Sequence, residues 1–88
     1  MSSITLKVNV FKEGDVYVAL CPMLNVSSFG DDIEHAKSSL KEALEAFLEE
    51  CEAMGTLEAV LEETGFIKKK TTWVPEEPIM EEKITLFC

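Results

Sequence analysis

The sequence predicts an α+β fold, in which an antiparallel β-sheet packs on one long amphipathic helix in the order β-β-β-α-(α)-β. Two observations predict it. Apolar residues recur every three or four positions through residues 31–54, which is the period of one helix face. On either side of that segment, apolar residues alternate with polar ones, as in half-buried strands. A length of only 88 residues is typical of one small domain, so we expect a single domain spanning residues 1–88.

The first 30 residues predict a three-stranded meander. Apolar side chains alternate over residues 4–10, and a nearly continuous apolar run follows at residues 16–21. Between them Gly14 suits a turn with positive φ, so the two strands should form an antiparallel hairpin. Pro22 ends the second strand because it has no backbone N–H donor. Residues 26–29 predict a third strand that leads into the helix.

The long helix should bury an apolar stripe and expose its charged faces. Asp31 is the expected N-cap, Glu34 completes a capping box, and Gly55 is the expected left-handed residue after the last turn. Phe47 lies mid-stripe, so its truncation to Ala is expected to cost about 3–5 kcal/mol. The predicted stripe consists of Ile33, Ala36, Leu40, Ala43, Leu44, Phe47, Leu48, Cys51 and Met54.

After the long helix, Thr56 is the expected cap of a shorter helix that ends at Gly65. The run Lys68, Lys69 and Lys70 favours a solvated edge strand, since lysine protects sheet edges from unwanted pairing. A phosphate-contacting patch is the alternative. At least one strand after the helices is expected to join the sheet.

The C-terminal residues 83–87 alternate again and predict a final strand. Pro75 and Pro78 precede it and should hold it away from its own sheet. The strand would then pair with a second copy of the chain, which predicts a homodimer or a dimer-based tetramer.

The charge and the cysteines restrict the function classes. A net charge of −9 disfavours direct binding to nucleic acid or to an anionic membrane, and it favours either a basic partner or simply solubility. Cys21, Cys51 and Cys88 have no spacing typical of a disulfide framework or a zinc site, and the first two lie among apolar residues. With no recognisable signal peptide, the expected location is cytoplasmic.

No catalytic arrangement is recognisable, and we expect neither an enzyme nor a cofactor. His35 is the single histidine and falls in the first helical turn, where a surface role is the simpler interpretation. A two-metal nuclease needs carboxylates converging from strands, and the expected strand interiors carry none. The glycines each punctuate an expected element and form no phosphate-binding loop.

One set of motifs is informative as a whole. Residues 17–24 read Tyr-Val-Ala-Leu-Cys-Pro-Met-Leu, and residues 28–31 read Ser-Phe-Gly-Asp before a helix rich in Glu, Ala and Leu. Here the sequence resembles the HicB antitoxin family, over about the first two-thirds of the chain. The resemblance implies a reduced ribonuclease-H-like module without a nuclease site. It also implies a partner, a small basic mRNA-cleaving toxin of the HicA type.

Many members of that family also carry a C-terminal DNA-binding domain, which nothing after Gly65 resembles. We therefore expect an antitoxin-like protein-binding module that neutralises such a toxin, with no direct nucleic-acid binding. The alternative is a stand-alone self-associating module of the same family. The expected partner-binding residues are those of the acidic helix face and the final strand: Glu42, Glu45, Glu49, Glu52, Ile84 and Leu86.

Overall fold

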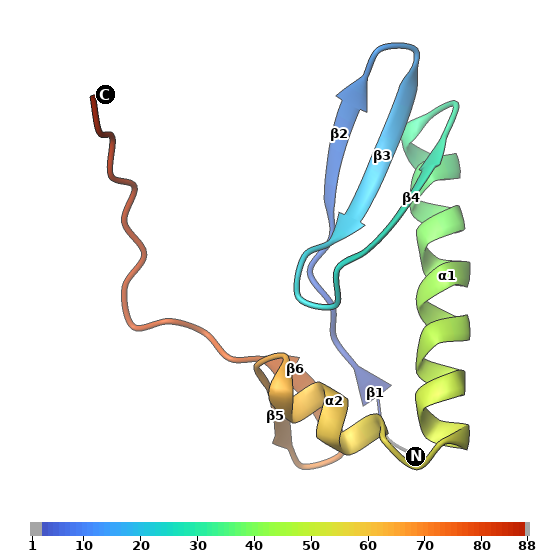
Figure 1. The fold of residues 1–88 in the computed structure, drawn as a ribbon, viewed down its shortest axis with the longest axis vertical. Helices are drawn as coiled ribbons and strands as arrows, with labels where there is room; N and C mark the ends of the chain where they lie inside the picture. The colour runs from blue at the N-terminus through green and yellow to red at the C-terminus, as the bar shows by residue number, and fades with distance from the viewer. Residues whose placement is uncertain (1–2, 88) are drawn as a thin grey trace.

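A computed structural model describes residues 3–87 (Figure 1). Two helices and six strands follow one another in these residues. They are β1 (Ser3–Ile4), β2 (Asn9–Glu13), β3 (Val16–Cys21), β4 (Val26–Gly30), α1 (Ile33–Ala53), α2 (Leu57–Glu63), β5 (Phe66–Lys69) and β6 (Thr72–Pro75). The α+β class is thus confirmed.

Strands β2, β3 and β4 form the predicted antiparallel meander, in that order across the sheet. Phe11 of β2 lies opposite Val18, and Val18 lies opposite Phe29 of β4. Gly14 adopts a φ of +60° in the β2–β3 turn, a conformation that favours glycine. The sequence signals for β3 and β4 were therefore sufficient to locate both strands.

Helix α1 is continuous over 21 residues, but its N-cap is Asp32 and not Asp31 as predicted. Asp32 has extended backbone, and its Oδ1 accepts a hydrogen bond from the N–H of His35 at 2.7 Å. Since His35 occupies the position of a capping-box glutamate, Glu34 cannot complete the predicted box. Either of the two adjacent aspartates fits the sequence pattern of an N-cap, so the pattern alone does not distinguish them.

Helix α1 is terminated as predicted by Gly55, which follows the last turn and has a φ of +74°. The N–H of Gly55 bonds to the carbonyl of Glu52 at 3.0 Å, and that of Thr56 to the carbonyl of Cys51 at 2.9 Å, which is a Schellman motif. Thr56 occupies the N-cap position of α2 as predicted, but its hydroxyl bonds back to the carbonyl of Cys51 at 3.3 Å and makes no capping hydrogen bond.

The core lies between α1 and the meander and continues under α2 and the second sheet (Figure 1). Most of the predicted stripe contributes to it, whereas Ile33 and Met54 are exposed and Phe47 is half-buried at its margin. The buried members of the cluster are Ala19, Cys21, Leu24, Ala36, Leu40, Leu44, Leu61, Phe66 and Trp73.

Gly30 sets how closely β4 approaches the start of α1. A Cβ atom at this position would lie 2.6 Å from the backbone nitrogen of Ala36 and 2.8 Å from the backbone of His35. Because those neighbours belong to a helical backbone, they cannot easily move away. Gly30 thus brings the first turn of α1 against the meander.

The strands after the helices do not join the meander, which corrects the prediction. Strands β5 and β6 form an antiparallel hairpin, and β6 pairs in parallel with β1, giving a second sheet of order β1-β6-β5. Lys70 lies in the hairpin turn with a φ of +57°, so the basic run bends back on itself. Lys68 and Lys69 do lie on an edge strand, as predicted.

The strand predicted over residues 4–10 is divided between the two sheets. Ile4 pairs with Trp73 of the second sheet, whereas Asn9 pairs with Leu20 of the meander. Residues 5–8 cross from one sheet to the other, outside both ladders. The alternation of apolar side chains is the same in both parts, so it could not reveal the division.

Residues 76–87 form a tail without regular structure, which leads away from the other elements on the side opposite α1 (Figure 1). The predicted strand over residues 83–87 is thus not formed within this chain. Strand β6, which precedes the tail, is already paired with β1 on one side and with β5 on the other, so it offers no free edge to the tail of its own chain.

Candidate protein-binding site

The four predicted acidic residues lie on one exposed stripe of α1, directed away from the core. Their spacing of three, four and three places them on one helix face. All four are exposed, which the helical period alone predicted correctly. They are Glu42, Glu45, Glu49 and Glu52.

None of these carboxylates is neutralised by a neighbouring cation. Within residues 3–87 the ion pairs are Lys7 with Glu77 at 3.0 Å and Lys37 with Glu34 at 3.5 Å. No buried charged residue lies beneath the stripe in this part of the chain either. Its charge is therefore available to a partner, although it is well screened at high salt.

The part of the stripe nearer the C-terminus of α1 borders an open groove of about 590 Å³, which we call the acidic groove. Glu45, Glu49 and Glu52 line one wall of this groove. Its apolar surface comes from Ile4, Leu48, Leu57 and Trp73, which four different elements contribute. Apolar surface beside unpaired carboxylates suits a partner segment that carries both aliphatic and basic side chains.

A second open groove of about 680 Å³ lies between residues 4–8 and α1, and we call it the apolar groove. Two sets of three aliphatic side chains line it: Ile4, Leu6 and Val8, and Leu40, Leu44 and Leu48. Its charged lining is mixed, with Lys37 and Lys41 beside Glu34 and Glu45, all of α1. Sequence analysis missed this site, because the alternation of residues 4–10 was interpreted as a fully paired strand.

The other two predicted site residues, Ile84 and Leu86, lie on the tail. Their side chains are 77% and 82% exposed. The tail and α1 lie on opposite sides of the molecule (Figure 1), so the structure does not bring these residues to the acidic stripe of the same chain.

In the described part of the chain, the histidine lies at the start of α1, and the two cysteines lie at the end of β3 and at the end of α1. Within residues 3–87 no group of three or more His, Cys, Asp and Glu side chains is placed to hold a metal ion. His35 Nδ1 accepts a long hydrogen bond of 3.4 Å from the N–H of Asp31, close to the helix start. Cys21 and Cys51 are buried in apolar surroundings, as predicted, and Cys88 lies outside the described residues.

The basic run contributes a small cationic surface. Lys68, Lys69 and Lys70 are exposed, and Lys68 Nζ lies 5.9 Å from the centroid of the Trp73 ring. No helix within residues 3–87 is both long enough and apolar enough to cross a membrane.

No family model matches the chain, and no curated protein or solved structure matches it. The resemblance to HicB antitoxins therefore remains a prediction from the motifs of residues 17–31. What the protein binds has to be argued from the two grooves, the acidic stripe and the tail.

Proposed function

We propose that this protein is an antitoxin-like binding module, which covers a small basic mRNA-cleaving toxin with the acidic groove and the stripe above it. The observation that carries the proposal is the unpaired acidic stripe of α1 beside apolar surface. Unpaired carboxylates speed the encounter with a basic partner and disfavour acidic ones. The apolar surface then sets how long the partner stays bound.

The charge distribution also supports a protein partner over nucleic acid. The chain carries 17 acidic and 8 basic side chains, and three of the lysines lie together at the β5–β6 turn. Phosphates would be repelled by the stripe, whereas a basic protein would be attracted to it. An RNA-cleaving toxin is itself expected to be basic, since it has to bind phosphates.

The test is inhibition of RNA cleavage. The product of an adjacent gene for a small basic protein should cleave an mRNA in vitro, and an equimolar amount of this protein should stop it. The double variant Glu49→Lys/Glu52→Lys should require about tenfold more protein, because both side chains border the acidic groove.

The matched control is Glu13→Lys/Asp15→Lys, which changes the net charge equally at the exposed β2–β3 turn. This turn is far from α2 and from the C-terminal end of α1, which border the acidic groove (Figure 1). It should inhibit almost as well as the natural chain. Cleavage that continues at a micromolar excess of the natural chain would reject the proposal. It would leave self-association as the better account.

A further inference from the structure

We propose that two copies of this chain exchange their tails, each tail docking as an added strand in the apolar groove of the other copy. This proposal concerns a different groove and a different partner from the toxin, and it does not depend on the proposed function. It rests on the shape of the groove, the unpaired backbone beside it, the composition of the tail and the direction in which the tail leaves the chain.

The two walls of the apolar groove have matching periods. Side chains two residues apart on an extended segment recur about every 6.6 Å, and side chains four apart on a helix recur about every 6 Å. Ile4, Leu6 and Val8 therefore run almost in step with Leu40, Leu44 and Leu48. An extended peptide that alternates apolar side chains has the same period and can fill the space between them.

The extended wall also offers backbone groups for a strand. Within residues 3–87, Leu6, Lys7 and Val8 make no backbone–backbone hydrogen bond, whereas the N–H of Thr5 bonds to Trp73 at 2.8 Å. Unpaired backbone next to apolar surface is the feature that strand addition uses, because the added strand satisfies donors and acceptors while its side chains fill pockets.

The tail has the composition that the apolar groove requires. Ile84 and Leu86 lie on the same face of an extended chain, and both are largely exposed here. Glu82 lies on that face too, two residues earlier. An antiparallel orientation to residues 4–8 places Glu82 near Lys41 and Leu86 near Ile4. Within residues 3–87 Lys41 makes no ion pair, whereas Lys37 already pairs with Glu34, so Lys41 is the cation that Glu82 would meet.

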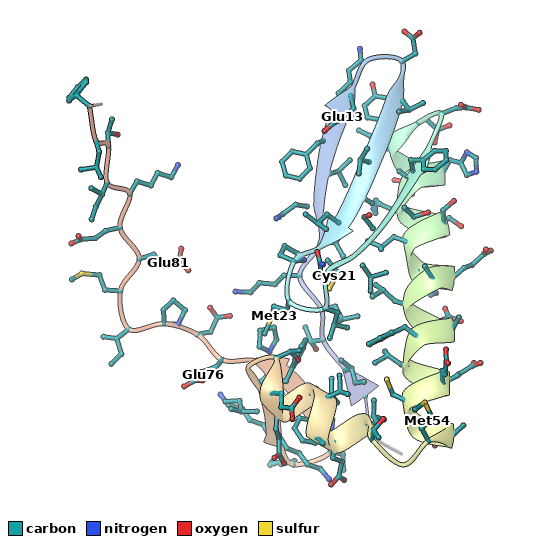
Figure 2. All side chains as sticks on the ribbon, in the orientation of Figure 1. Glu13, Cys21, Met23, Met54, Glu76 and Glu81 are labelled. Atoms are coloured by element: carbon teal, nitrogen blue, oxygen red, sulfur yellow. The ribbon has the colours of Figure 1, made fainter. Side chains whose placement is uncertain are left out.

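The start of the tail leads away from the apolar groove of its own chain. Lys7 alternates with Leu6 and Val8, which line the groove, and its Nζ instead reaches Glu77 at 3.0 Å. The tail therefore begins on the opposite face of that segment. Figure 2 shows Glu81 far from the sheets and helices, so the tail does not reach the apolar groove of its own chain in this structure.

A mutual exchange of tails between two identical copies gives a closed dimer. A twofold axis gives each copy one docked tail and one occupied groove, so the two contacts are equivalent and no groove or tail remains open for a third copy. Each contact removes apolar side chains of the tail from water, which is the main favourable contribution to such association.

Light scattering on the full chain, under reducing conditions and at tens of micromolar, tests the proposal. The expected mass is about twice 9.8 kDa. The double variant Ile84→Asn/Leu86→Asn should raise the dimer dissociation constant about a hundredfold or more and appear monomeric. The matched control Lys83→Asn/Thr85→Asn, on the other face of the tail, should remain a dimer.

A charge exchange tests the docking site itself. Lys41→Glu and Glu82→Lys should each weaken the dimer several-fold, and the combined variant should recover most of the loss, because both partners of the pair are reversed. Circular dichroism of all tail variants should keep the helical signal of the natural chain, since the tail contributes no buried side chain to the fold of its own chain.

A natural chain that is monomeric at tens of micromolar would overturn the proposal. So would a dimer that tolerates Ile84→Asn/Leu86→Asn, or one that responds equally to the control pair. None of these results bears on toxin inhibition, because the measurement contains this chain alone.

Discussion

Leu40 and Phe47 occupy the same predicted stripe of α1 but differ in burial. Leu40 is 1% exposed at the centre of the core cluster, and Phe47 packs against the cluster from its margin. Leu40→Ala should therefore lower the free energy of unfolding by about 2–5 kcal/mol, through lost burial and a residual cavity. Phe47→Ala should cost less than Leu40→Ala, because the exposed part of its ring already contacts water.

Urea denaturation of both variants measures this difference. A larger loss at Phe47 than at Leu40 would contradict the arrangement of α1 on the meander. The helical period alone could not separate the two residues, since it gives the face of a helix but not how deeply each turn is covered.

At the scale of the elements, the cap of α1 offers a matched pair of neighbouring aspartates. Asp32→Ala removes the acceptor of the His35 N–H bond and should cost about 0.5–2 kcal/mol. Asp31→Ala leaves that bond intact and should cost much less. Thermal unfolding of the two variants is the measurement, and equal losses would show that the N-cap is shared or misplaced.

The elements that sequence predicted best are those with local signals. Strands β3 and β4 and both ends of the long helix have a turn glycine, a proline or a capping residue beside them. The β5–β6 hairpin was missed, because its turn uses Lys70 at positive φ where glycine, asparagine or aspartate is typical. Nothing local distinguishes Lys70 from the two lysines before it.

Features that depend on distant partners were not predictable from local patterns. The division of the first strand follows from the pairing of Ile4 with Trp73, which lies 69 positions later in the sequence. Both grooves arise because residues 4–8 come to lie beside α1. The acidic stripe, in contrast, was predictable, because it needs only the period of a single helix.

At the level of the whole molecule, the two proposed interactions use adjacent grooves. The acidic groove opens beside Glu49 and Glu52, and the apolar groove beside Lys37 and Lys41. The grooves meet at Ile4, Glu45 and Leu48, which border both of them. Tail exchange would thus fill one groove of each copy and leave the carboxylates of Glu49 and Glu52 directed to solvent.

If the acidic groove recruits a basic partner, association should depend strongly on salt, and binding kinetics at several salt concentrations measure this dependence. With the adjacent basic protein immobilised, the association rate of the natural chain should fall about tenfold or more between roughly 10 mM and 150 mM salt. Glu49→Lys/Glu52→Lys should slow association at low salt and flatten the salt dependence, whereas Glu13→Lys/Asp15→Lys should change both much less. No binding at micromolar concentration, or rates indifferent to salt and to the Glu49/Glu52 reversal, would contradict the account.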